Sequence, residues 1–558
     1  MVSSKDSRRA LRGAAVAATL LVGCSDSLEI SVALVDPCNQ EAVATVDYIG
    51  LEPRGTGIDS TALSTIEEVG AFSAPEIAVP LAPDFQLVAT GHRGAFDAAA
   101  TALGISAPVD LTEAEGAVSI QVPFSLLGQF YRTTNLSLPE TDANRCSQLG
   151  TDRFGATATV LPSGHVVVVG GVRYVDGFIE YPRTVEVYDP STGTFLSGPP
   201  GSSGRWELSN GQARRSHTAT LLSNGQILIT GGQAPSADVV GAEGALQTAF
   251  FIDASDPTGL QISAGGVPLN GPRTGHQAVA LSDGRVVLVG GIRALDTSNR
   301  LEQHTYLDSV EVYDPSLGAF LVASDASANA IRLSAARSGH SAVAVPGANA
   351  VFVAGGYNGS GPVTSVDVVR FSVGGAQVTT AGASLTVGPI HHAAGVTQEG
   401  AIVLSGGYST LANIRSAPAV DSVANVEMWA VDPETGTAIS VCTDAMLAAR
   451  GQHTMSVIGQ RAVIVGGRDT LGAPRADAEV GRLNLVADAG SSCFALTPEM
   501  QSMSDARAEH AAAVLSGTQE VLVLGGVQAD ATGQSTLGSS IRSAEIYSDL
   551  SRRQIVTR

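Results

Sequence analysis

The sequence is poor in charged and in aromatic side chains. Of its 558 residues, 15% are charged and 5% are aromatic, whereas 44% are hydrophobic. A chain of this length and composition can bury a large core, so we do not expect it to be disordered. No run of basic residues follows the first segment, and the formal net charge is -21. Because nucleic-acid binding depends on lysine and arginine neutralising phosphates, we expect no nucleic-acid partner.

The sequence also lacks the local motifs of several enzyme classes. It contains no Gly-x-Ser-x-Gly elbow, no His-Glu-x-x-His helix and no EF-hand loop. Aspartate-containing stretches such as DASDPTG from Asp253 offer the oxygen ligands that calcium prefers, but we interpret them as solvated turns. We therefore predict no catalytic residue, no metal and no cofactor.

The N-terminal apolar run is short. Four basic residues precede it, and it extends from Gly13 to Val22, whereas a bilayer-spanning helix needs roughly 20 apolar residues. This arrangement is typical of a secretory signal. Leu21-Val22-Gly23-Cys24 resembles the lipobox of bacterial lipoproteins, in which the peptide is cleaved before the cysteine and the thiol is lipidated. The resemblance implies that residues 1–23 are removed, that Cys24 carries a lipid anchor, and that the protein resides at the bacterial outer membrane.

Cysteine is scarce. Apart from Cys24, four cysteines remain in a compartment that we expect to be oxidising. Three pairings are possible. We favour Cys38 with Cys146 and Cys442 with Cys493, provided that the Cα atoms of each pair lie within about 7 Å.

Glycine, by contrast, is abundant, and it occurs in a repeat. Seven apolar runs, of which VVVVGG, RVVLVGG and EVLVLGG are examples, end in a glycine pair, and the pairs lie 51 to 65 residues apart. The pairs are Gly170-Gly171, Gly231-Gly232, Gly290-Gly291, Gly355-Gly356, Gly406-Gly407, Gly466-Gly467 and Gly525-Gly526. An Arg-x-x-His signature precedes most of them, but the first unit has Ala156 in place of histidine and the fifth has Pro389 in place of arginine.

Each unit predicts four short antiparallel strands. The run before the glycines is apolar throughout, as in a strand buried on both faces, and the later VEVYD segments alternate. Four-stranded sheets repeated around an axis form a β-propeller. A phosphate loop is used once and usually carries a lysine, which none of the pairs has, so we interpret the glycines as scaffold where backbones approach closely.

These units resemble the kelch repeat. The resemblance rests on the glycine pair followed by Tyr-Asp-Pro and, seven residues after the tyrosine, an aromatic residue, as in Tyr188 with Phe195 and Tyr313 with Phe320. It implies an all-β protein with a seven-bladed kelch-type β-propeller over residues 148–558. Residues 24–147 lack the repeat, and their short strands predict a small β-sandwich-like domain. One or two degenerate blades are the alternative for this segment.

Recurrent polar residues favour a structural role. A catalytic group is needed once, so we interpret repeated residues such as Arg273, His276 and Glu311 as hydrogen bonds and ion pairs between blades. Binding usually resides on variable loops of a rigid scaffold, and arginine and tyrosine are common anchors of interfaces. The candidate ligand-face residues follow the glycine pairs: Arg173, Tyr174, Arg293, Tyr357, Asn358, Tyr408, Arg468 and Asp469.

We therefore predict a non-enzymatic, lipid-anchored cell-envelope protein whose propeller face binds a protein or glycan partner. One alternative is a galactose-oxidase-like or other carbohydrate-active enzyme. The copper-radical site of those oxidases needs a tyrosine joined to a cysteine, and neither Cys442 nor Cys493 is accompanied by a matching ligand set. The other alternative is a purely structural envelope component.

Overall fold

The computed structural model describes most of the chain after residue 145 and parts of the chain before it. From 145 to 548 it describes all residues except 177, 236–242, 297–300, 387–388, 411–420, 485–493, 497–500, 516–517 and 530–538. Before 145 it describes 17–20, 28, 30–35, 38, 45–58, 65–68, 79, 81–95, 99–106, 109–112, 114, 118–136, 138 and 142. The predicted lipidation site, Cys24, lies outside the described residues.

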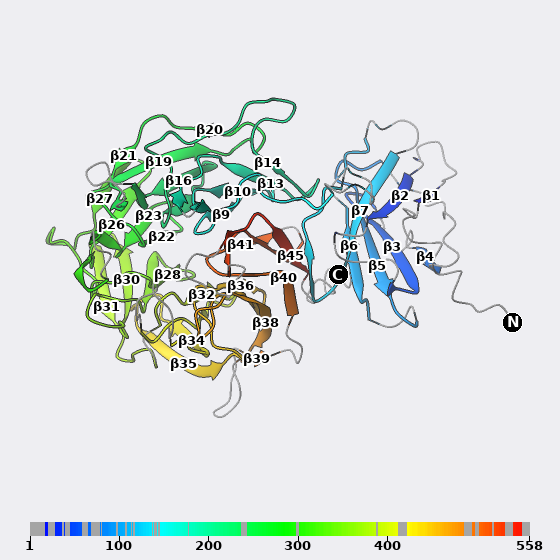
Figure 1. Cartoon of the computed structure of the whole chain (residues 1–558). Coiled ribbons are helices and arrows are strands. Elements are labelled where there is room, and N and C mark those ends of the chain that lie inside the picture. The colour runs from blue at the N-terminus through cyan, green and yellow to red at the C-terminus, as the bar shows by residue number, and fades with distance from the viewer. Residues whose placement is uncertain are drawn as a thin grey trace.

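The all-β prediction is confirmed. The described residues form β-strands joined by turns, together with the short 3₁₀ helix η3 (Leu301–Gln303). Within the described part of the chain, no helix has the length and apolar character needed to cross a bilayer. Figure 1 shows two bodies, one built around a single sheet near the N-terminus and the other a ring of sheets.

The strands of the first body form one mixed sheet in the order β1-β2-β7-β6-β5-β3-β4. They are β1 (Ala17–Leu20), β2 (Ile30–Val35), β3 (Tyr48–Arg54), β4 (Thr65–Glu68), β5 (Gln86–His92), β6 (Ala102–Ile105) and β7 (Val118–Leu126). β1 lies within the segment predicted as a signal peptide. The sequence predicts a small β-sandwich-like domain, and the described strands form one continuous sheet in which β2 pairs in parallel with β7. Alternate residues such as Ile49, Leu51 and Phe124 bury one apolar face.

The second body contains further sheets of four or five strands, which we number 1 to 7 in chain order. Sheet 1 has β9 (Thr157–Val160), β10 (Val166–Val169), β13 (Glu186–Asp189) and β14 (Thr194–Leu196). Sheet 2 has β15 (Thr218–Leu221), β16 (Gln226–Thr230), β19 (Thr248–Asp253), β20 (Gln261–Ile262) and β21 (Val267–Pro268). Sheet 3 has β22 (Gln277–Ala280), β23 (Val286–Val289), β26 (Val310–Asp314) and β27 (Ala319–Val322). Sheet 4 has β28 (Ser341–Ala344), β29 (Ala350–Ala354), β30 (Val366–Ser372) and β31 (Gly375–Thr380).

Sheet 5 has β32 (Ala393–Val396), β33 (Ile402–Ser405), β34 (Asn425–Val431) and β35 (Ala438–Ala445). Sheet 6 has β36 (Thr454–Ile458), β37 (Arg461–Val465), β38 (Arg475–Leu483), β39 (Phe494–Leu496) and β40 (Gln501–Arg507). Sheet 7 has β41 (Ala511–Leu515), β42 (Glu520–Leu524), β45 (Ala544–Ser548) and β8 (Gln129–Arg132). Four short hairpins project from sheets 1, 2, 3 and 7: β11 (Arg173–Val175) with β12 (Phe178–Glu180), β17 (Gln233–Pro235) with β18 (Glu243–Ala245), β24 (Ile292–Ala294) with β25 (Thr305–Tyr306), and β43 (Val527–Gln528) with β44 (Ser539–Ser540).

The sheets follow one another around a closed ring (Figure 1). The first strand of each sheet contacts the first strand of the next, and β41 of sheet 7 contacts β9 of sheet 1. An apolar cluster fills the space between each pair of neighbouring sheets, including the pair formed by sheets 7 and 1. The second strands are the most buried elements, because both of their faces contribute to these clusters. All four valines of β10, for example, are fully buried.

The N-terminal segment completes the ring. β8 lies within residues 24–147, which the sequence assigns to the first domain, yet it pairs with β45 as the outer strand of sheet 7. A disulfide joins Cys38 to Cys146, with Cα atoms 5.6 Å apart. The backbone of Cys38 also forms an antiparallel β-bridge with Arg132 at the end of β8. Cys442 is also disulfide-bonded. The partner predicted for it, Cys493, lies outside the described residues.

Candidate functional site

Each glycine pair lies where two sheets meet. Both glycines of every pair have positive φ. A Cβ on the first glycine would lie 2.4–2.6 Å from the carbonyl oxygen of the signature arginine of the next sheet, or of Pro389 in sheet 5. The amide of the second glycine donates a hydrogen bond of 2.8–3.1 Å to that same oxygen. The pairs therefore pack backbone against backbone and leave no cradle for a phosphate.

The signature arginines are buried, and each forms hydrogen bonds within its own sheet. Arg153, Arg214, Arg273, Arg337, Arg450 and Arg507 are at most 1% exposed, and each donates to the carbonyl oxygen of its sheet's first glycine. Five of them also pair with a buried carboxylate: Arg153–Glu186, Arg273–Glu311, Arg337–Asp367, Arg450–Glu479 and Arg507–Glu545. Sheet 2 has no carboxylate at this position, and the guanidinium of Arg214 lies 4.9 Å from the ring centroid of Phe250 instead.

The signature histidines link neighbouring sheets. His217, His276, His392, His453 and His510 each share a hydrogen bond from Nε2 with a hydroxyl of the preceding sheet. Burial lowers their pKa values, to about 3 for His217 and His510 and to about 4 for His392, so they are neutral at pH 7. Sheet 1 has Ala156 at this position, and the preceding sheet has Ala511 where sheets 1, 2, 4 and 6 carry serine or threonine. His340 is an exception, because neither of its ring nitrogens has a hydrogen-bond partner among the described residues.

Seven residues, one just before the first strand of each sheet, share one backbone conformation. Two positions after each signature arginine, or after Pro389, the backbone turns into the left-handed region, with φ between 52° and 66°. The residues are Gly155, Ser216, Gly275, Gly339, His391, Gln452 and Glu509, which we call the axial mouth. Backbone hydrogen bonds connect neighbouring members, such as Glu509 N to Gln452 O and Gly155 N to Glu509 O. Behind the mouth, the first strands of several sheets line a cavity of about 490 Å³.

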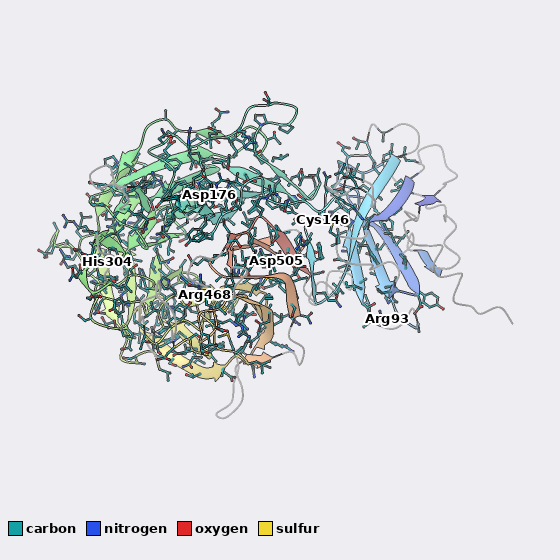
Figure 2. All side chains as sticks on the ribbon, in the orientation of Figure 1. Arg93, Cys146, Asp176, His304, Arg468 and Asp505 are labelled. Carbon is teal, nitrogen blue, oxygen red and sulfur yellow. A yellow bond between two sulfur atoms is a disulfide. The ribbon has the colours of Figure 1, made fainter. Side chains whose placement is uncertain are left out.

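One side of the axial mouth carries a polar network. The imidazole of His391 meets the ring of Tyr408 edge-on, with centroids 6.4 Å apart. Gln452 Oε1 accepts hydrogen bonds from Tyr408 Oη at 3.3 Å and from Arg468 Nε at 3.0 Å. Arg468 also lies 3.5 Å from the carboxylate of Glu509. Figure 2 shows Arg468 nearer the centre of the ring than His304, which lies toward its outer side.

The charges at the mouth influence one another. Burial lowers the pKa of His391, and the nearby carboxylate of Glu509 raises it in part. Burial raises the pKa of Tyr408, so this phenol is neutral. Arg215 precedes Ser216, the member of the mouth that follows Gly155. Burial lowers the pKa of Arg215, but Glu243, Tyr181 and Glu509 outweigh burial and raise it overall. The charge of Glu509 therefore acts on Arg468, which it contacts, and at longer range on Arg215.

The candidate ligand-face residues from the sequence do not lie together. Tyr408 and Arg468 reach the axial mouth, although Tyr408 is only 1% exposed. Arg173 pairs with Glu180 and Asp152, and Tyr174 stacks on Phe154. Tyr357 meets Tyr306 edge-on, and Arg293 is exposed. Asn358 and Asp469 cap their own turns.

Sequence reasoning missed His391, Gln452 and Glu509. All three lie directly before a signature histidine. At the equivalent position the first four units have only glycine or serine. The departure from small residues in three consecutive units was the available signal.

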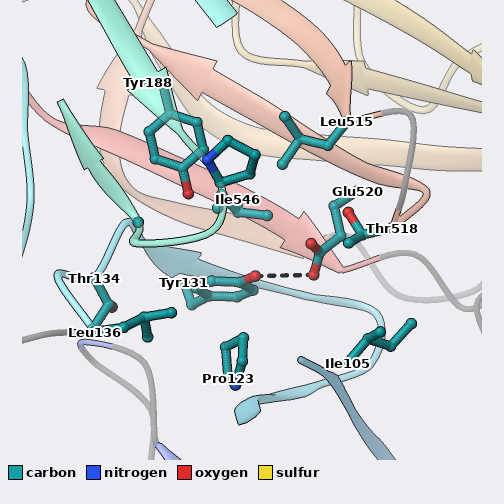
Figure 3. Close-up of a pocket in the computed structure, with 12 residues that line it drawn as sticks. Ile105, Pro123, Tyr131, Thr134, Leu136, Tyr188, Leu515, Thr518, Glu520 and Ile546 are labelled. Carbon is teal, nitrogen blue, oxygen red and sulfur yellow. Dashed lines mark hydrogen bonds between the residues drawn. The ribbon is translucent and has the colours of Figure 1, made fainter. Parts of the chain in front are cut away.

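A second cavity lies between the two bodies (Figure 3). Its volume is about 70 Å³, and its lining comes from the N-terminal sheet and from sheets 1 and 7. Tyr131 Oη donates a hydrogen bond of 2.9 Å to Glu520 Oε1, and both side chains are buried. Burial and the charge of Glu520 raise the pKa of Tyr188, which also lines the cavity. This volume holds no more than a few waters, so the axial mouth is the candidate functional site.

Comparison with known proteins shows similarity in fold. No family model matches the chain, and no curated protein matches it. Among solved structures, the protein YjhT aligns with a TM-score of 0.43 and 10% identity, over 63% of this chain and 99% of its own. A fungal alcohol oxidase of the AA5 family, in complex with copper, aligns with a TM-score of 0.48 and 15% identity, over 71% of this chain and 74% of its own. These neighbours are of the β-propeller and galactose-oxidase type.

The prediction that the protein is not an enzyme is corrected by this comparison. The finding against it is that an alcohol oxidase is among the similar structures. At 15% identity the likeness does not establish this chain as an enzyme either. The residues do not fit a metal centre, because the described part of the chain holds no group of three or more histidine, cysteine or acidic residues able to bind a metal ion. We derive no chemical step through copper.

Proposed function

We propose that sheets 1 to 7 are the blades of a kelch-type β-propeller, and that the protein binds a protein or glycan partner through the face that carries the axial mouth. The regular glycine pairs and Arg-x-x-His signatures support the kelch assignment. Contacts between first strands around the whole ring support a closed propeller.

The axial mouth is the observation that carries the binding proposal. Loops from all seven sheets converge there in one backbone conformation, with φ between 52° and 66°. A rigid scaffold that presents convergent polar side chains over a cavity of about 490 Å³ is the usual form of a ligand site. Elsewhere on this face, arginines such as Arg173 and Arg215 are already engaged by carboxylates.

Site-specific photo-crosslinking tests the choice of face. A photoreactive residue replaces Gln452 at the mouth or, as a matched control, Ser316 in the exposed turn at the opposite end of sheet 3. In cells that make the full chain, we expect a crosslinked product from position 452 and none from position 316. A product from position 316 alone would overturn the proposal. No product from either position would favour a purely structural envelope component.

We also propose that Cys24 is lipidated and holds the protein at the bacterial outer membrane. The lipobox-like segment at residues 21–24 supports this proposal. Metabolic labelling with radioactive palmitate tests it. The wild-type chain should incorporate label and sediment with outer membranes, whereas Cys24→Ala should do neither. Labelling that persists in Cys24→Ala would refute the assignment.

A further inference from the structure

We infer that the axial mouth binds a saccharide unit in the sector formed by His391, Gln452 and Glu509. The inference rests on the proposed function, that this face binds a partner, and it names the chemistry of that partner. It begins from an asymmetry in the ring. Sheets 1 to 4 place Gly155, Ser216, Gly275 and Gly339 at the mouth, whereas sheets 5 to 7 place three large polar residues there.

The large residues are held at an energetic cost. The left-handed region is unfavourable for a residue with a Cβ, and His391, Gln452 and Glu509 all occupy it. Glycine serves at the equivalent positions of three other sheets, so the ring itself requires no side chain there. Non-glycine residues that keep such a backbone cluster at functional sites. The backbone of the ring therefore does not itself require these three side chains, which leaves them available to a ligand.

These side chains retain hydrogen-bonding capacity. In the part of the chain that the structure describes, no group hydrogen-bonds to the imidazole of His391, which lines the cavity. The Glu509 carboxylate, 27% exposed, has its closest cation, Arg468, at 3.5 Å, which is longer than a good hydrogen bond. Gln452 uses its Oε1 within the network, and no bond to its Nε2 is present among the described residues.

The charges favour a neutral, polyhydroxylated ligand. Glu509 and Arg468 offset each other, so an ionic ligand gains little net attraction. Carboxylate, amide and guanidinium groups present paired acceptors and donors, which suit neighbouring hydroxyls of a sugar ring. The opposite half of the mouth has only glycine and serine, which leaves room for the ligand. The adjoining cavity of about 490 Å³, which His391 lines and Gln452 and Glu509 do not, lies in the range of small-molecule sites.

Substitution by glycine separates binding from folding. Glu509→Gly should relieve the backbone and leave the melting temperature unchanged or higher, yet weaken sugar binding by about tenfold or more, because hydrogen bonds to a charged group are lost. Ala328→Gly is the matched control, because it relieves the same left-handed backbone in an exposed turn outside the axial mouth. It should leave binding unchanged.

The probes are glucose, galactose, mannose and N-acetylglucosamine, each added to the full chain and followed by saturation-transfer-difference NMR. We expect transfer to at least one of these sugars, loss of that signal in Glu509→Gly, and a partial signal in Glu509→Gln. No transfer to any of the four, or wild-type transfer in Glu509→Gly, would overturn the saccharide site. If crosslinking at position 452 then captures a protein, the proposed function stands and only the ligand class fails. If no crosslink forms there, both fail.

Discussion

The amide of Gly526 donates a hydrogen bond of 2.8 Å to the carbonyl oxygen of Arg153. Gly526 follows the second strand of sheet 7, and Arg153 precedes the first strand of sheet 1, so this bond joins the last sheet to the first. The same bond occurs at the other six junctions, for example from Gly291 to Arg337. At each junction, the glycine pair therefore allows the backbones of two neighbouring sheets to approach closely.

A methyl group at this junction should destabilise the fold. In Gly290→Ala the new Cβ would lie 2.6 Å from Arg337 O, and φ is 62°. We expect a loss of roughly 2 kcal/mol or more in the free energy of unfolding, measured by urea titration. Gly318 has the same φ of 62° with no atom within 4 Å of a Cβ, so Gly318→Ala reports the backbone cost alone. Equal losses in the two variants would show that the close approach contributes nothing.

The repeat made much of the second body predictable. Seven apolar runs ending in glycine pairs predict buried second strands, and recurrence of Arg273, His276 and Glu311 predicts a structural network. The network could be inferred because the same residue types recur at the same position in most units, although not in every one. Phe250 replaces a carboxylate beside Arg214. The first body has no repeat, and its single sheet depends on the pairing of β2 with β7, which are far apart in sequence.

The candidate site was less predictable for a physical reason. Residues after the glycine pairs were expected on the surface, but Tyr408 packs against Gly451 of the next sheet and is buried. Whether a loop residue points to solvent or into a junction depends on the tertiary packing of neighbouring sheets. The strained residue Glu509 occurs within a structural signature, so its local sequence resembles scaffold.

Removing both partners of a buried ion pair should cost less stability than the sum of the two single removals. Arg153 Nη2 lies 2.6 Å from Glu186 Oε1, with side-chain exposures of 0% and 1%. Arg153→Met leaves the carboxylate buried without its cation, and Glu186→Gln leaves the guanidinium without its anion. Each single variant should lose about 3–5 kcal/mol of stability. The double variant should lose less than the sum of the two, and a double-mutant cycle measures the difference. Strict additivity would contradict a direct pair.

Removal of a linking histidine should lower the melting temperature. His276 Nε2 shares hydrogen bonds with Thr218 at 3.2 Å and Thr230 at 2.9 Å, and its imidazole lies beside Gly231. His276→Ala creates a cavity and leaves two hydroxyls without this partner, so we expect a loss of about 2–4 kcal/mol. His165, near the turn after β9, bonds to nearby Ser163 and serves as the control. Calorimetry measures the melting temperature, and an unchanged value for His276→Ala would argue against the structural role.

Acid should weaken the fold through the buried histidines. Burial lowers the pKa of His217, His340 and His510 to about 3, whereas the unfolded chain titrates near 6.5. Between these values the unfolded state binds more protons, so stability is fully present above pH 6.5 and is lost as pH falls. At pH 5 each of these histidines should cost about 2 kcal/mol relative to pH 7. Urea titrations of the wild-type chain and of His217→Gln at both pH values measure the effect. The variant should show a smaller difference between the two pH values, and an equal difference would assign the acid sensitivity to other groups.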